Sequence, residues 1–244
     1  MRRIVKTEAI CLRQHNWRES SKIVTLLTEE IGVITGVAKG ARRPKSMLGP
    51  SLNLFAHSQV LLYLQENREL ATIGSADLLN AYAGIAQSYQ RLVTAARIAG
   101  FVSQISLRHH PEPRLFSLLK NSLTALSSAS GSGDFSALTG SFVIKTATFL
   151  GFRPVLDRCT ICHNGINLGA DKDGIFFGFD MVRGGVVCPD CAKGVKGRIT
   201  AEEILILQRL LLTPVIQLIQ EEISPHLLKL VNDYADFHFG IRSV

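Results

Sequence analysis

The sequence predicts an α+β protein in which an N-terminal β-barrel of the OB type precedes an α-helical domain with a four-cysteine, zinc-finger-like insertion. Three observations predict it. Apolar residues alternate along the first 80 residues, they recur at helical spacing from about residue 81, and two C-x-x-C pairs interrupt the helical part. The predicted domains are the barrel (1–80), the helical domain (81–156), the cysteine insertion (157–198) and C-terminal helices that complete the helical domain (199–244).

The barrel prediction depends on five short strands. The runs 5–12, 22–28, 33–37, 58–64 and 70–74 are rich in alternating or β-branched apolar residues, with a turn at 29–32 and a hairpin tip at 66–69. Five short strands with little helix are typical of an OB barrel. Cys11 stands alone in the first run, where we expect it to be a small buried apolar residue.

Helical spacing replaces alternation in the middle of the chain. Apolar residues recur every three or four positions in 85–102 and 115–126, and a further helix is expected over 135–150, ending before Gly151 and Pro154. Thr200 and Glu203 fit a capping box that opens the last helical region, which Pro214 and Pro225 divide.

Composition indicates a globular protein, and the surplus of positive charge favours an acidic partner. Of the 244 residues, 46% are hydrophobic and 19% charged, and 27 basic against 20 acidic residues give a formal charge of +7. No apolar run reaches the length of about 18 residues that a membrane helix needs, and no apolar signal core follows the N-terminus. We therefore expect a cytoplasmic protein without a membrane partner, in a compartment where disulfides rarely persist.

Four cysteines have the spacing of a metal site. Cys159 and Cys162 form one C-x-x-C pair, Cys188 and Cys191 form another, and a glycine-rich segment separates them. Two intervening residues let a tight turn direct both sulfurs at one ion, and two such turns complete a tetrahedron. Two disulfides or an iron–sulfur cluster are the alternatives. We predict one structural Zn²⁺, because four thiolates leave no position for a reactive water.

No catalytic motif accompanies these features. The sequence has no H-E-x-x-H, G-x-S-x-G, P-loop or dinucleotide-binding fingerprint, so we predict a binding protein and not an enzyme.

A basic segment follows the third predicted strand. Residues 36–46, GVAKGARRPKS, contain Lys39, Arg42, Arg43 and Lys45 without an acidic residue. Such a segment is either a solvated hairpin or a contact for a polyanion.

Three segments resemble one family, with order and spacing preserved over essentially the whole chain. Residues 22–46 look like the N-terminal OB domain of the RecO family of bacterial recombination mediators, 149–159 are similar to its helix-to-zinc junction, and 237–240 are similar to its C-terminal helix end. Two features depart from the family pattern. Met47 and Leu48 stand where members commonly continue with basic residues, and the sequence stops at Val244, short of the basic tail of many members.

The resemblance implies a function in DNA repair. RecO proteins bind single- and double-stranded DNA, anneal complementary strands and, with RecR, load RecA onto DNA coated by single-strand-binding protein, without nucleotide hydrolysis. They contact the C-terminal tail of single-strand-binding protein through the helical region. The cations available there are Arg91, Arg97, Arg108, Arg114 and Lys120. The resemblance also implies a cytoplasmic location, at the nucleoid.

Charge is expected to dominate the DNA contact. Only Trp17, Phe55 and Tyr63 are aromatic in the first 80 residues, and some of these must fill the barrel, so base stacking is scarce. The predicted DNA-binding residues are therefore all cations: Lys39, Arg42, Arg43 and Lys45, helped by Arg13, Arg18 and Lys22. Three alternatives stay open: an RNA-binding accessory factor with an OB fold and a zinc ribbon, a metal-dependent nuclease, and a structural adaptor that recruits partners.

Overall fold

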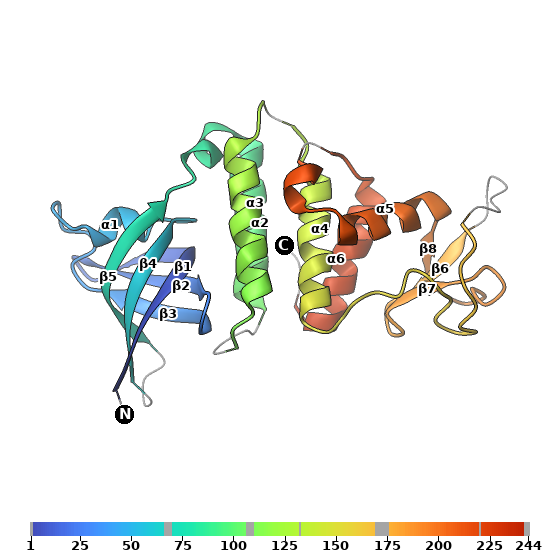
Figure 1. Ribbon diagram of the computed structural model, residues 1–244, viewed down its shortest axis with the longest axis horizontal. Helices are drawn as coiled ribbons and strands as arrows, with labels where there is room; N and C mark the ends of the chain where they lie inside the picture. The colour runs from blue at the N-terminus through green and yellow to red at the C-terminus, as the bar shows by residue number, and fades with distance from the viewer. Residues whose placement is uncertain are drawn as a thin grey trace. The chain divides into compact units, whose positions relative to one another are not determined.

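The chain forms two compact units, Met1–Ser132 and Gly133–Val244 (Figure 1). The computed structural model describes residues 2–65, 70–105, 110–131, 133–168, 176–219 and 221–241. The predicted hairpin tip at 66–69 and Arg108 lie outside the described residues.

Five strands of the first unit close into a barrel. They are β1 (Arg2–Trp17), β2 (Ser21–Thr28), β3 (Gly32–Ala38), β4 (His57–Gln65) and β5 (Ala71–Asn80). Their hydrogen-bonded order is β1-β2-β3-β5-β4, and β4 pairs again with β1. Each predicted strand overlaps an observed one, because alternating apolar residues have only one face to bury. Strand β1 extends beyond both ends of the predicted run 5–12, and β5 continues past the predicted end at residue 74. The predicted OB-type barrel is confirmed.

Strand β1 takes part in two sides of the barrel. Residues from Arg2 to Ile10 pair with β4, and residues from Ala9 to Trp17 pair with β2. The register with β2 shifts between Cys11 and Arg13, and such a bulge bends a strand. A short parallel pairing between β3 and β5 completes the closure.

The barrel core is apolar and includes both alanines of the basic segment, Ala38 and Ala41. Inward side chains of the strands pack with Leu52, which follows the short helix α1 (Leu48–Ser51), and with Ala41. Cys11 is fully buried, as expected, and its thiol lies 3.5 Å from the carbonyl oxygen of Leu52.

Two helices belong to the same unit as the barrel. After the 3₁₀ helix η1 (Ala83–Gln87), α2 (Tyr89–Gln104) packs against β1 and α3 (Pro113–Ser128). The contacts thus group α2 and α3 with the barrel, although the barrel strands themselves end at Asn80, the predicted end of the first domain.

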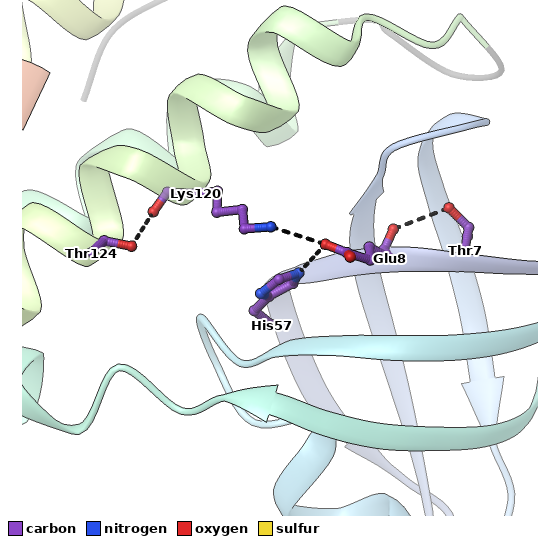
Figure 2. Close-up of polar contacts among 5 residues, drawn as sticks. All are labelled: Thr7, Glu8, His57, Lys120 and Thr124. Carbon is purple, nitrogen blue, oxygen red and sulfur yellow. Dashed lines mark hydrogen bonds and ion pairs between the residues drawn. The ribbon is translucent and has the colours of Figure 1, made fainter. Parts of the chain in front are cut away.

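A polar cluster joins the barrel to α3. Glu8 lies on β1, His57 begins β4 and Lys120 lies on α3 (Figure 2). The same carboxylate oxygen, Oε2 of Glu8, is 2.7 Å from Nε2 of His57 and 3.1 Å from Nζ of Lys120. The His57 ring is buried and meets the ring of Phe116 on α3 edge to face.

The second unit is built around one buried helix. Helix α4 (Ser136–Phe149) is apolar on nearly all sides and packs against three other helical segments: α5 (Ala201–Leu212), η2 (Val215–Leu218) and α6 (Pro225–Phe239). The predicted capping box is present, since Thr200 and Glu203 exchange hydrogen bonds at the start of α5. Among the described residues, no helix is both long and apolar enough to cross a membrane.

A small sheet carries the cysteines. Strands β6 (Phe177–Asp180), β7 (Gly185–Val187) and β8 (Gly197–Ile199) pair in the order β7-β6-β8. Cys159 and Cys162 precede β6 in the chain, and Cys188 directly follows β7. The fold class predicted from the sequence, a barrel followed by helices with a cysteine insertion, is confirmed.

Candidate nucleic-acid interface and metal centre

A basic groove lies on one side of the barrel. Its volume is about 1050 Å³, and its walls come from the β1–β2 turn, the end of β3 with the segment after it, and the start of β5. Arg18, Lys39 and Arg43 line it together with Trp17, and among the described residues that line it Glu19 is the one acidic residue. Cations from two segments that are distant in the sequence therefore share one surface.

The segment after β3 is held firmly beneath its exposed cations. Ala41 is buried in the barrel core, and the amide of Arg42 donates to the carbonyl oxygen of Ser20 at 3.0 Å. Gly40 has φ +71°, a backbone conformation that glycine adopts without strain, and its carbonyl accepts from the amide of Arg43 at 3.0 Å. We call the turn 39–46 the basic loop. In the part of the chain that the structure describes, none of its four cations forms an ion pair.

Trp17 is the aromatic residue that faces this groove. The guanidinium of Arg18 lies 4.2 Å from the centre of the indole ring, and the carbonyl oxygen of Arg18 accepts from Nη1 of Arg42 at 3.2 Å. Arg18 itself has φ +53°, in the left-handed region. Phe55 is buried in the barrel, whereas Trp17 is half-buried and lines the groove. The sequence identified Trp17 only as one of three aromatics that could fill the core.

The other predicted cations lie in different surroundings. Nζ of Lys22 donates to side-chain oxygens of Gln14 at 2.8 Å and Asn53 at 3.1 Å. Arg13 lines a separate, smaller cavity of about 230 Å³ with residues of β2, β3 and the end of α2. Lys45 is exposed on the basic loop but does not line the groove. The structure thus brings Arg18, Lys39 and Arg43 together, with Arg42 bonded beside them.

Several cations of the helical region are already engaged. Arg91 is buried, and its guanidinium donates to the carbonyl oxygens of Gly84 and Gly131. Arg114 pairs with Glu112, and Lys120 pairs with Glu8. Arg97 is exposed.

Four cysteine sulfurs form one cluster in the second unit. The Sγ atoms of Cys159, Cys162, Cys188 and Cys191 all lie within 4.8 Å of one another, so these residues could hold a metal ion. The sulfurs of Cys162 and Cys188 are 3.8 Å apart, which is far from a disulfide bond length of about 2.05 Å. A tetrahedron with Zn–S bonds of about 2.3 Å has edges of about 3.8 Å, so the spacing fits that ion.

Backbone amides favour the charged thiolate form of Cys159, which is the form that binds a cation. Burial opposes charge on Cys159, but hydrogen bonds that include those from the amides of Cys188 and Ile161 outweigh burial and lower its pKa to about 6. The hydrogen bond to Cys188, with burial and Cys162, raises the pKa of Cys191 to about 12. The raised pKa of Cys191 reflects the repulsion that four thiolates at this spacing would have, and a bound cation would remove that repulsion.

Two family models together match nearly the whole chain. A family model described as Recombination protein O N terminal matches residues 1–82, and one described as Recombination protein O C terminal matches residues 86–243. The chain belongs to the RecO family. The resemblance seen in residues 22–46 and 149–159 is confirmed.

Curated RecO proteins match along most of their length. This RecO-family chain is 31% identical over 245 residues to a protein of Chlorobium limicola named DNA repair protein RecO, covering 96% of this chain and 92% of that protein. Proteins of the same name from Rubrobacter xylanophilus and Desulforamulus reducens are 32% and 29% identical. Those matches cover 77% and 97% of this chain, and 71% and 90% of the two relatives.

Proposed function

We propose that this protein is a recombination mediator in DNA repair that binds single- and double-stranded DNA through the basic groove. The observation that carries the proposal is the placement of Arg18, Lys39 and Arg43 around one groove of a closed OB barrel. A positive groove on such a barrel is how many proteins hold a nucleic-acid backbone without reading its sequence. The name of the relatives, DNA repair protein RecO, supports the same role.

Strand annealing follows from binding by charge. Cations that neutralise phosphates reduce the repulsion between two complementary strands and leave their base edges free to pair. We propose that the protein anneals strands in this way and, together with RecR, loads RecA onto DNA coated by single-strand-binding protein, whose tail it contacts. Family membership supports these partners, and a cytoplasmic location at the nucleoid accords with them.

The cysteine cluster is proposed to hold one structural Zn²⁺. Cys159, Cys162, Cys188 and Cys191 would be its ligands, and the ion would fix the turns that contain them. Metal binding to such sites contributes folding free energy, so the ion stabilises the second unit.

The salt dependence of DNA affinity tests the central proposal. Affinity for a (dT)-oligonucleotide is measured at several salt concentrations for the wild type and for the variant Lys39→Ala/Arg42→Ala/Arg43→Ala/Lys45→Ala. The log–log slope should decrease in magnitude by about 0.7 for each phosphate that the variant no longer neutralises. An unchanged slope would mean that the basic loop does not contact phosphates.

Two further measurements test the role in DNA repair against the RNA-binding alternative. Annealing of complementary strands coated with single-strand-binding protein should be faster in the presence of this protein. Matched RNA and DNA oligonucleotides should then compete for the groove, and an exclusive preference for RNA would favour an RNA-binding accessory factor.

A further inference from the structure

A second concave surface lies beside the cysteine cluster. It has a volume of about 380 Å³ and is formed by β6, β8 and the turns from Pro189 to Val195. We call the small sheet β6–β8 with its cysteine-containing turns the ribbon, and this surface the ribbon slot. The residues that give it chemical character are Phe176, Lys193 and Arg198.

Two glycines of the small sheet are among the residues that line the slot. Gly178 and Gly197 lie on neighbouring strands, where Gly178 pairs with Arg198 and Phe179 pairs with Gly197. A Cβ on Gly197 would lie 2.5 Å from the carbonyl oxygen of Phe179, and one on Gly178 would lie 3.1 Å from Val195. Glycine at both positions therefore lets the sheet backbone pack closely against Phe179 and Val195.

An aromatic ring and two cations form the rim. Phe176 is 50% exposed, and the guanidinium of Arg198 lies 5.9 Å from its ring centre. Lys193 is exposed, and Lys196 is an exposed cation in the same segment. Among the residues that the structure describes, no carboxylate lines the slot, and neither Lys193 nor Arg198 forms an ion pair.

The cysteine cluster positions one wall of the slot. Successive turns lead from the metal-ligand pair to Lys193: the amide of Cys191 donates to Cys188, that of Ala192 to Pro189 and that of Val195 to Ala192. Phe176, in contrast, directly precedes β6. The two sides of the slot are therefore held by different parts of the ribbon.

We propose that the ribbon slot binds a segment of single-stranded DNA, with a base stacked on Phe176 and phosphates held by Lys193 and Arg198. Every base has a π-face, so an exposed ring flanked by cations suits a strand of any sequence. The described residues that line the slot carry two positive charges, Lys193 and Arg198, which favours a ligand with phosphate groups over an apolar side chain. The proposal extends the annealing function proposed above and rests on it, because annealing requires two strands to be held at once.

The experiment compares two variants with a charge-matched control. The variants are Phe176→Ala and Lys193→Ala/Arg198→Ala, and the control is Arg209→Ala/Lys229→Ala. The control removes the same charge from α5 and α6 of the same unit, at residues that do not line the slot. The full chain with its bound metal is used throughout, and thermal stability and zinc content establish that each variant is folded.

The readouts are DNA affinity, annealing rate and crosslinking. In a background that already carries Lys39→Ala/Arg43→Ala in the groove, Phe176→Ala should weaken (dT)-oligonucleotide binding at least about fivefold. Lys193→Ala/Arg198→Ala should decrease the salt slope by about 1.4, the sum of two phosphate contacts. Both variants should slow annealing, whereas the control should leave the affinity, the salt slope and the annealing rate unchanged. In the protein with Phe176 intact, an oligonucleotide containing 5-iododeoxyuridine should crosslink to Phe176.

Three results would overturn the proposal. If folded slot variants anneal and bind as the control does, the slot is not a DNA site, although the groove proposal would stand. If the wild type binds no oligonucleotide, the proposed function itself fails. If Phe176 is not crosslinked but an acidic peptide binds in a manner that depends on Phe176, the slot serves a protein partner instead.

Discussion

Nε2 of His57 lies 2.7 Å from Oε2 of Glu8, which joins the start of β4 to β1 where α3 packs on the barrel. Burial lowers the pKa of His57 more than Glu8 raises it, so the ring is neutral and donates its Nε2–H to the carboxylate. Burial raises the pKa of Glu8, but hydrogen bonds from Lys120 and His57 outweigh it and the net shift is downward.

Replacing His57 should destabilise the first unit much more than replacing Lys120. His57→Ala removes a buried ring and a charge-assisted hydrogen bond, at a cost of about 1–3 kcal/mol in the free energy of unfolding. Lys120→Ala removes a partly exposed ion pair and should cost about 1 kcal/mol or less. Urea unfolding at pH 7 measures both, and equal costs would contradict the importance assigned to the buried contact.

Acidification should destabilise the same unit in two stages. An unfolded His57 gains a proton near its ordinary pKa of 6.5 while the folded residue resists it, so stability falls as pH drops through that value. The contribution of Glu8 is present above its ordinary pKa of 4.5 and disappears below it. Unfolding measured from pH 7.5 to 5 should show a shallower decline in stability for His57→Gln than for the wild type, and parallel curves would argue against this linkage.

Trp17 should report directly on occupation of the groove. It is the one tryptophan of the sequence and lines the groove beside Arg18, so DNA binding there should change its fluorescence. Trp17→Ala should lose about 1–3 kcal/mol of affinity if a base stacks on the indole, and Trp17→Phe should lose less. Unchanged fluorescence at saturating oligonucleotide would place the DNA elsewhere.

Single cations should differ according to their position. Arg43→Ala and Lys39→Ala, which alter the lining of the groove, should each reduce the salt slope of DNA binding by about 0.7. Arg13→Ala removes the same charge from a different cavity and should leave the slope unchanged. A uniform effect of all three would mean that only net charge matters.

Chelation should expose four thiols and destabilise the second unit. Cys11 is fully buried, and burial raises its pKa to about 12, so it should react only after unfolding. We expect one zinc ion per wild-type chain, none in Cys159→Ser, and one in Cys11→Ala, which serves as the control. Cys159→Ser should lower the melting temperature more than it lowers DNA affinity. A folded, equally stable Cys159→Ser variant that no longer binds DNA would reverse the structural role given to the metal.

The barrel and the cysteine cluster were predictable because each has a local signature. Alternation of apolar residues places the five strands, and two C-x-x-C turns bring four sulfurs to one point without knowledge of the rest of the fold. The capping box of Thr200 is equally local. The sequence did not predict on which side of the barrel each cation lies. That location depends on the bulge near Arg13 and on the parallel pairing of Val37 with Thr72, which have no local signature.

The packing partners of the helices could not be predicted either. Apolar spacing predicts α2 and α3, but an apolar helical face looks alike whether it packs on a barrel or on other helices. Their grouping with the barrel depends on contacts such as that between Glu8 and Lys120, which are 112 positions apart.

The two-sided pairing of β1 has a consequence for biosynthesis. During synthesis, β1 can pair with β2 as soon as β2 has left the ribosome. The first residues of β1 can pair only after β4 has been made, and the barrel closes only when β5 pairs with β3. Contacts between such distant segments form late. A nascent chain that ends before β5 therefore has an open sheet with unpaired edges, and such edges favour aggregation until β5 is made.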